Sequence, residues 1–156
     1  MATKRIFSLV PSITELVVDL GLEETLVGVT KFCVHPAHLR KQKTVIGGTK
    51  NLRLELIQQL QPDLILANKE ENERTQVESL AAMFPVYTSE IANFNDALLM
   101  IQEVGAATGA GQKAEELISL INQAKSRFEA TNLNKFKQYR TLSVSYTHLR
   151  AHETHH

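Results

Sequence analysis

The sequence predicts an α/β protein in which helices cover both faces of a mainly parallel β-sheet. Apolar runs such as Ile6–Val10 and Leu64–Ala67 lack the apolar–polar alternation of a half-exposed strand, which indicates strands buried on both faces. Segments with apolar residues at helical spacing follow these runs, and strands that alternate with helices are typical of parallel sheets. We therefore expect a three-layer α/β/α lobe.

The first strand, helix and second strand form one βαβ unit. Pro11 ends the first apolar run, and Ser12 with Glu15 matches a capping box, in which the serine hydroxyl accepts from the Glu15 N–H. Gly21 is placed to end this helix. The next apolar run, Leu26–Val29, is then the second strand.

The later elements repeat this alternation. Glycine and proline separate them, and each helix carries apolar residues three or four positions apart. We expect a short helical turn at Ala37–Lys41, strands at Thr44–Ile46, Leu64–Ala67 and Pro85–Tyr87, helices over Leu52–Leu60, Val77–Phe84 and Phe94–Val104, and a long helix over Gln112–Ala130.

The chain divides into four parts by this pattern: an α/β lobe over residues 1–109, a long connecting helix over 110–134, a further piece of fold over 135–144 and a tail over 145–156. Tyr139–Val144 could begin a strand. From Ser145 onward the sequence shows neither the helical nor the strand spacing of apolar residues, and it contains four histidines. This favours a tag, a residue of a cloning junction or a foreign reading frame. One hypothesis is therefore a truncated reading without a function of its own.

Composition excludes several classes of function. The 156 residues carry 17 basic and 17 acidic side chains, and this balance argues against nucleic acid or an anionic membrane as the main partner. Cys33 is the only cysteine, so no internal disulfide is possible. Met1–Arg5 lead directly into the first strand without a secretory signal, so the chain as written is expected in the cytoplasm.

Four loops follow the predicted strands at their carboxyl ends. Parallel strands end at one edge of a sheet, where open α/β folds bind ligands. The loops offer one aromatic ring, glycines that expose backbone, and hydrogen-bonding side chains, which suits a polar ligand. They are Pro11–Ser12, Lys31–His35, Gly47–Asn51 and Asn68–Asn72.

Catalytic and metal-binding motifs find little support. The sequence contains no nucleophile elbow, no Walker A loop and no G-x-G-x-x-G. Cys33 and His35 could form a nucleophile–base pair, and with His38 they could bind a metal, but the spacing matches no standard pattern. Glu70–Glu71 is interpreted as a favourable charge at a helix start. A small cytoplasmic α/β enzyme acting on a nucleotide or metabolite, with His35 as acid–base, stays an alternative.

A set of residues resembles the opening of the class III periplasmic binding proteins, the substrate-binding components of ABC importers for cobalamin, ferric siderophores and haem. The set is Arg5-Ile6-x-Ser8-Leu9-x-Pro11-Ser12-x-Thr14-Glu15, Leu20-Gly21, Val27-Gly28-Val29, Gly47-Gly48 and Pro62-Asp63-Leu64-Ile65. The resemblance covers about residues 5–143.

The resemblance implies two α/β lobes joined by one long helix, with the second lobe missing from this chain. It implies a monomer that binds a corrinoid or a ferric chelate as ligand, has no cofactor of its own, and works with ABC permease subunits in the periplasm or at the cell surface. Glu55 would dock on the transporter. Ligand contacts are carried over by position to Pro11, Ser12, Phe32, Thr49 and Asn68.

Overall fold

The computed structural model describes residues 4–140 and 142, and its centre is a five-stranded sheet in the order β3-β2-β1-β6-β7. Every neighbouring pair in this sheet is parallel. The predicted α/β fold with a mainly parallel sheet is thus confirmed. The strands are β1 Ile6–Ser8, β2 Leu26–Val29, β3 Thr44–Val45, β6 Leu64–Asn68 and β7 Val86–Ser89.

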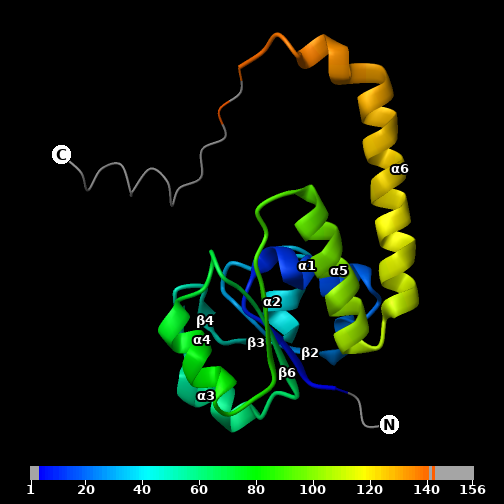
Figure 1. Ribbon diagram of the computed structural model, residues 1–156. Helices are drawn as coiled ribbons and strands as arrows, with labels where there is room; N and C mark the ends of the chain where they lie inside the picture. The colour runs from blue at the N-terminus through cyan, green and yellow to red at the C-terminus, as the bar shows by residue number, and fades with distance from the viewer. Residues whose placement is uncertain (1–3, 141, 143–156) are drawn as a thin grey trace, which may run out of the picture. The chain divides into compact units, whose positions relative to one another are not determined.

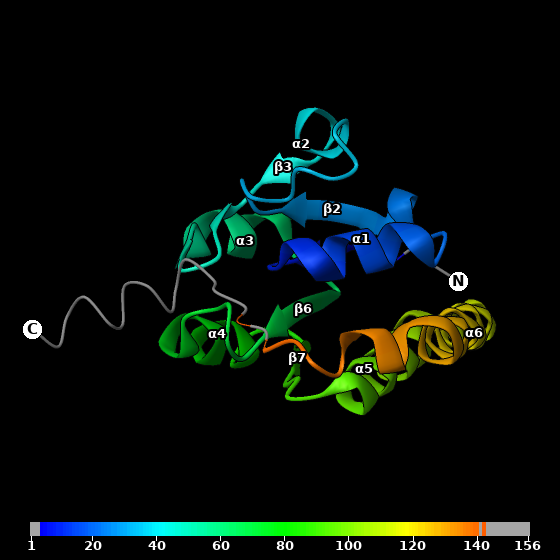
Figure 2. The same cartoon turned by 90° about the horizontal axis from the view of Figure 1, so that it is seen from above.

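Helices cover both faces of this sheet. The chain steps from β1 to β2 and β3 in one direction and from β6 to β7 in the other, so right-handed crossovers place their helices on opposite faces. In Figures 1 and 2, α1 and α5 lie on one face and α3 and α4 on the other. The helices are α1 Pro11–Asp19, η1 Glu23–Thr25, α2 Leu39–Gln42, α3 Leu54–Leu60, α4 Arg74–Ala81, α5 Phe94–Thr108 and α6 Gly111–Phe136.

The core is centred on β1 and β6, whose residues are all buried. Phe7 of β1 is fully buried and lies opposite Gly28 of β2 in the strand register. A Cβ at Gly28 would lie 2.8 Å from the Phe7 ring, so the glycine leaves the space that the ring fills. The continuous apolar runs read from the sequence are therefore central strands.

The end of α1 follows the sequence expectation. Gly21 has a φ of +77°, the left-handed conformation that favours glycine. Its N–H donates to the Val18 carbonyl, and the Leu22 N–H donates to the Val17 carbonyl. This is the Schellman arrangement, which satisfies the last carbonyls of the helix.

The start of α1 differs from the sequence expectation. The predicted capping box is wrong, because the helix begins at Pro11, and Val10, which has no capping side chain, is the N-cap residue. Proline is favoured at the first helical position since its missing N–H would have no helical partner. Ser12 is therefore already inside the first turn. The Thr14 hydroxyl instead donates to the Val10 carbonyl at 3.1 Å.

A two-stranded antiparallel ribbon, β4 Gly47–Gly48 with β5 Asn51–Leu52, was not predicted. We expected the glycines to end a strand and Leu52 to belong to a helix, but Leu52 is buried in β5 and α3 begins at Leu54. Gly47 has a φ of +113°, and a Cβ there would lie 2.4 Å from the Asn51 carbonyl. The glycine thus permits the sharp reversal.

The last two helices meet at a close approach. Asn93 caps α5 by accepting from the Asp96 N–H, and Gly109, with a φ of +76°, ends it. A Cβ at Gly105 of α5 would lie 2.4 Å from the Cβ of Ala114 in α6, so this glycine lets the two helices touch.

Helix α6 has 26 residues and contains the predicted long helix. The chain forms one compact unit up to Leu120 and a second from Ile121 onward. The role of α6 as a connector stays a prediction. The strand expected from Tyr139 falls largely outside the described residues, and the histidine-rich tail over 145–156 falls wholly outside them.

Candidate functional site

The candidate site is the edge of the sheet where all five parallel strands end. The β1–α1 turn, the segment after β2, the β4–β5 hairpin and the β6–α4 turn all emerge there, as the sequence predicts. The Lys31 N–H donates to the Gly47 carbonyl at 2.8 Å, so the segment after β2 is bonded to the hairpin. The Lys50 ammonium donates to the Glu70 carbonyl at 2.7 Å, which bonds the hairpin to the β6–α4 turn.

Phe32 presents an aromatic surface at this edge. Phe32 is 50% exposed. The Lys31 ammonium lies 5.0 Å from the ring centroid, within the range of a cation–π contact. A Cβ at Gly48 would lie 3.3 Å from the ring, so the hairpin backbone passes close beneath it.

Pro11 and Ser12 occupy the first turn of α1 at the same edge. Pro11 is half-buried and Ser12 is exposed. Because Ser12 does not cap the helix, its hydroxyl is not used as the sequence reading supposed. Both residues stay predicted ligand contacts.

Thr49 and Asn68 lie on neighbouring loops. Thr49 is half-buried in the turn of the hairpin, and Asn68, the last residue of β6, is 8% exposed. The Asn68 amide nitrogen donates to the Ser89 hydroxyl at 3.0 Å, and its carbonyl accepts from the N–H groups of Glu70 and Glu71 at 3.0 Å each. A ligand contact from Asn68 would therefore replace one of these hydrogen bonds.

A pocket of about 450 Å³ adjoins this corner of the edge. Its lining comes from the β6–α4 turn, from α4 and from Thr88 of β7. It mixes charged residues such as Lys69 and Glu70 with the apolar side chain of Val77. The pocket is thus continuous with the position of Asn68, one of the predicted contacts.

Asn72 is a residue of this edge that the sequence reasoning missed. Its side chain is 4% exposed and bonds three loops at once. The amide nitrogen donates to the carbonyls of Leu9 at 3.1 Å and Thr49 at 3.0 Å, and the side-chain oxygen accepts from the Asn68 N–H at 2.9 Å. A polar residue soon after a buried strand is the available sequence signal, but its partners become visible only in the folded chain.

Cys33 supports this edge from within. The thiol is fully buried, and its sulfur lies 3.1 Å from the Thr14 hydroxyl and 3.3 Å from the Thr30 hydroxyl. The Thr14 hydroxyl oxygen also lies 2.9 Å from the Ser8 hydroxyl oxygen. Cys33 thus holds the segment after β2 against α1, which is a structural use of the thiol.

The hypotheses built on Cys33 with histidines gain no support. His35 is exposed while Cys33 is buried, so the two do not form the exposed pair that a nucleophile and its base require. The His38 ring contacts the Glu23 carboxylate. Within residues 4–140 and 142, no three His, Cys, Asp or Glu side chains are grouped so that they could hold a metal ion.

Glu70 and Glu71 do not lie at a helix start as interpreted. They belong to the turn that precedes α4, where their N–H groups donate to Asn68. The acidic residue at the N-cap is Glu73, whose carboxylate accepts from the Thr75 N–H. The helix begins at Arg74, after the turn that the Asn68 side chain closes, so Glu70 and Glu71 lie outside it.

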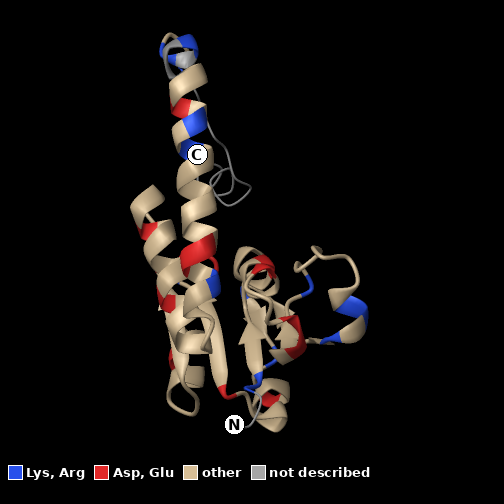
Figure 3. Ribbon diagram, turned by 90° about the vertical axis from the view of Figure 1, so that its right-hand side faces the viewer, with Lys and Arg blue, Asp and Glu red and all other residues tan. Residues whose placement is uncertain are grey.

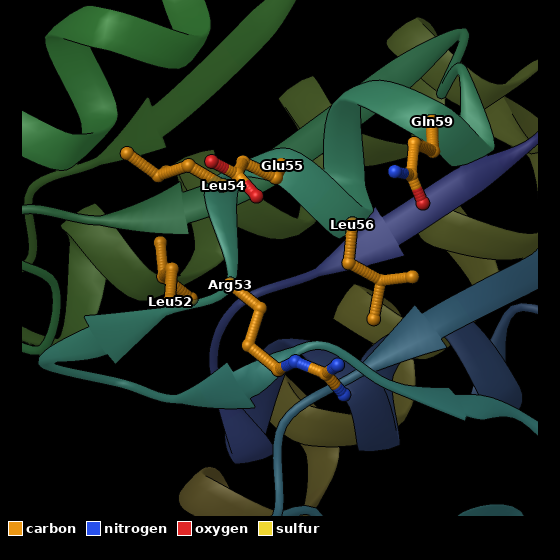
Figure 4. A pocket seen from close by; sticks show the side chains of 6 residues that line it. All are labelled: Leu52, Arg53, Leu54, Glu55, Leu56 and Gln59. Carbon is orange, nitrogen blue, oxygen red and sulfur yellow. The ribbon is translucent and has the colours of Figure 1, made fainter.

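Glu55 lies exposed in the first turn of α3. This helix leads from the hairpin at the carboxyl edge back to the start of β6, so its first turn lies toward the carboxyl edge. Glu55 lines a pocket of about 480 Å³ together with Leu52, Arg53, Leu54, Leu56 and Gln59 (Figure 4). An acidic group is therefore displayed beside apolar and basic side chains.

Along the ribbon in Figure 3, positions of acidic residues and of basic residues occur on several elements, and neither colour dominates the view. This agrees with the equal numbers of the two kinds in the sequence. In the described part of the chain, no helix has both the length and the apolarity needed to cross a membrane.

Known proteins share this sequence and fold. The profile of the family described as periplasmic binding protein matches residues 6–150. An uncharacterised ABC transporter substrate-binding lipoprotein of Bacillus subtilis, YvrC, is 32% identical over 119 residues, which are 74% of this chain and 37% of that protein. The vitamin B12-binding protein of Yersinia pestis is 29% identical over 132 residues, covering 81% of this chain and 47% of that protein.

Solved structures agree with the sequence comparison. A periplasmic haem-binding protein from Pseudomonas aeruginosa superposes with a TM-score of 0.73 at 28% identity, covering 80% of this chain and 45% of that one. The chain spans about half the length, or less, of the curated relatives it matches. On the profile match and this shared fold, the chain belongs to the periplasmic binding protein family.

Proposed function

We propose that this chain is part of the substrate-binding component of an ABC importer, and that its ligand is a corrinoid or a ferric chelate such as haem or a ferric siderophore. The observation that carries this proposal is the carboxyl edge, where four loops are bonded together beneath one exposed aromatic ring, Phe32. Such an edge suits recognition of a polar ligand with an apolar body. Relatives named for vitamin B12 and haem supply the ligand class.

The residues proposed to contact the ligand are those carried over from the family resemblance. Phe32 would cover an apolar part of the ligand, and the Lys31 ammonium above its ring would meet a negative or polar group. The others are Pro11, Ser12, Thr49 and Asn68. We expect the lobe described here to bind weakly on its own, because a ligand held from one side keeps much of its surface in water.

Membership in a family of binding proteins disfavours the enzyme alternative. His35, proposed there as acid–base, is exposed and belongs to no grouped set of titratable side chains in the described part of the chain that could hold a metal. We further propose a periplasmic or cell-surface location, in keeping with a relative named as a lipoprotein.

Titration calorimetry tests the ligand proposal. Cyanocobalamin, haemin and ferric citrate are titrated into this chain and into the gene product that carries it. We expect at least one probe to bind the gene product, and Phe32→Ala to weaken it about tenfold, since burying an aromatic ring contributes roughly 1.5–3 kcal/mol.

Met83→Ala is the matched control for Phe32→Ala. Met83 is 45% exposed, but it lies between α4 and β7, at the opposite edge of the sheet from Phe32. The control should bind like the unchanged protein. Failure of all three probes to bind the gene product would refute the proposed function.

Glu55 is proposed as a contact with the permease. An exposed carboxylate beside a pocket can pair with a basic group on a partner, and loss of such a pair changes association more than stability. Glu55→Gln should weaken capture of the gene product by its cognate permease, while Glu24→Gln, exposed at the opposite edge, should not. Equal capture of both variants would remove Glu55 from the interface.

A further inference from the structure

Asn72 joins three segments that are far apart in the sequence. Its side-chain nitrogen donates to the carbonyl of Leu9, 63 positions away, and to that of Thr49, 23 positions away. Its side-chain oxygen accepts from the Asn68 N–H. Both side-chain N–H groups of the asparagine are therefore used, and the side chain is 4% exposed.

The three partners belong to loops that form the ligand edge. Leu9 lies between β1 and α1, two residues before Pro11. Thr49 is in the turn of the β4–β5 hairpin, and Asn68 ends β6. Two of the three partners, Thr49 and Asn68, are themselves proposed ligand contacts. One buried side chain thus bonds loops that a ligand would meet together.

We propose that Asn72 is a positioning residue that holds these loops in their binding arrangement before any ligand arrives. The inference rests on the proposed function of this edge, and it adds that the edge is preorganised. A short hairpin with two residues in each strand is not stable alone, so an outside contact has to fix it. Preorganisation favours affinity because the ligand does not have to order the loops.

The chemistry of the site explains why asparagine is suited to it. Two backbone carbonyls face the side-chain nitrogen and one N–H faces the oxygen, so the side chain must offer two donors and one acceptor on a short stem. Aspartate has the same shape and keeps the acceptor, but it turns a carboxylate oxygen toward two carbonyls. Asn72→Asp therefore removes the donor function and places a negative charge against two carbonyls, while it keeps the acceptor.

Gln76 provides a matched control on the same hairpin. Its side-chain oxygen accepts from the Leu52 N–H at 2.9 Å, and its nitrogen donates to the Lys50 carbonyl at 3.3 Å. It contacts the hairpin from α4 as Asn72 does from the preceding turn, but its hydrogen bonds do not reach Leu9. Gln76→Ala should thus loosen the hairpin without freeing the β1–α1 turn.

Residue-resolved hydrogen exchange of the unliganded chain tests the preorganisation. The Leu9 N–H, bonded to the Leu66 carbonyl, and the Asn68 N–H report on two of the joined loops, and the Arg53 N–H, bonded to the Ile46 carbonyl, reports on the hairpin. In Asn72→Asp, which keeps the acceptor for the Asn68 N–H, we expect exchange at least about tenfold faster at the Leu9 and Arg53 amides than in the unchanged chain, with little change at Asn68 or in β7. Gln76→Ala should accelerate only the hairpin.

Two outcomes would overturn the proposal. Uniform acceleration that includes β7 would show a general loss of stability, and unchanged exchange at Leu9 and Arg53 would show that other contacts fix the loops. If Asn72→Asp does not fold, Asn72→Ala, which introduces no charge, is measured with the same expectations at Leu9 and Arg53 and with faster exchange also at Asn68, whose acceptor it removes. These results need no ligand, so they stand even where the proposed function fails.

Measured dissociation constants distinguish a positioning role of Asn72 from a general effect on stability. With a probe that binds the unchanged gene product, Asn72→Asp should raise the dissociation constant at least tenfold. Leu80→Ala, a cavity variant in the buried face of α4, lowers stability without touching the loops and should leave the constant within about twofold. Equal weakening by both variants would contradict the positioning role, whereas absence of binding in the unchanged protein would contradict the proposed function alone.

Discussion

The lobe up to Leu120 and the later part of α6 are stabilised by contacts of different range. In the lobe, hydrogen bonds join Asn72 to Leu9 across 63 positions and Tyr87 to Glu103 across 16. In α6, the Lys125–Glu129 ion pair joins residues four positions apart, and residues 122–131 are exposed. The contacts named in the lobe thus join distant segments of the chain, whereas the ion pair named in the later part of α6 joins neighbours in sequence.

This difference predicts how each region responds to substitution. A side chain buried between distant segments loses its contacts with all of them when it is shortened. A local ion pair between exposed side chains of one helix is screened by water, so its loss costs little. The variants below test that contrast, from the largest expected loss of stability to the smallest.

Phe7→Ala should cause the largest loss. Phe7 is fully buried in the central strand, so the substitution leaves a cavity and costs about 3–5 kcal/mol, a large share of the roughly 5–15 kcal/mol that a domain has. Urea unfolding followed by circular dichroism measures it. Leu120→Ala, at an exposed position of α6 that is the last residue of the same lobe and is 61% exposed, should cost about 0.5 kcal/mol or less. Similar losses of stability in Phe7→Ala and Leu120→Ala would contradict the burial of Phe7 and the exposure of Leu120.

Gly47→Ala should cause the next largest loss, about 1–3 kcal/mol, because the backbone conformation favours glycine and the new Cβ overlaps the Asn51 carbonyl. Gly111→Ala is the contrast at the exposed first residue of α6, within the same lobe, where a Cβ would meet nothing within 4 Å. There the change should be neutral or slightly stabilising, by up to about 1 kcal/mol. The same unfolding assay compares them, and a stable Gly47→Ala would exclude this hairpin geometry.

The Tyr87–Glu103 hydrogen bond of 2.6 Å between β7 and α5 should give a pH-dependent effect. Burial, then the hydrogen bond and charge of Glu103, raises the pKa of Tyr87 above its ordinary value near 10. Folding therefore favours the neutral phenol. The contribution of this phenol to the free energy of unfolding is complete below about pH 10 and is lost as the pH rises further.

Tyr87→Phe should accordingly lose less stability than the unchanged chain between about pH 9 and pH 11. At neutral pH the variant should be less stable by about 0.5–1.5 kcal/mol, the usual net value of one hydrogen bond. Thermal unfolding at a series of pH values measures both effects. Parallel pH curves for the two proteins would argue against the contact between β7 and α5.

Glu129→Gln should have the smallest effect. It removes the 3.3 Å ion pair with Lys125 inside one helix, and such pairs contribute about 0.2–0.5 kcal/mol. The helical circular dichroism signal should fall slightly at low salt, and the difference should vanish at about 1 M salt, where charges are screened within a few ångström. A loss comparable to that of Gly47→Ala would show that α6 depends on distant contacts as the lobe does.

The sequence predicted most elements of the lobe because their signals are local. Apolar runs predicted β1, β2 and β6. Gly21 predicted the end of α1, and the spacing of apolar residues predicted α5 and α6. The capping box failed since Pro11 is itself compatible with the first helical position, so the helix begins before the serine. The hairpin was missed because two-residue strands carry too little pattern to be recognised.

The candidate edge was predicted in outline. Parallel strands place their following loops at one edge whatever the loops contain, so four loop positions could be named from the sequence. The use of each side chain could not, since Cys33 and Asn72 meet partners contributed by distant segments. Whether Phe32, Thr49 and Asn68 contact a ligand stays a prediction.

The sequence by itself determined the periodicity of this protein: which runs are buried strands, where helices end at glycines, and that α6 is one long helix. Those properties depend on interactions within a few residues along the chain. Only the tertiary structure decided that Asn72 bonds Leu9 and Thr49 and that Cys33 lies against Thr14 and Thr30. Such contacts form when the order of the strands in the sheet brings distant residues together. That order cannot be predicted from patterns among residues that are close in the sequence.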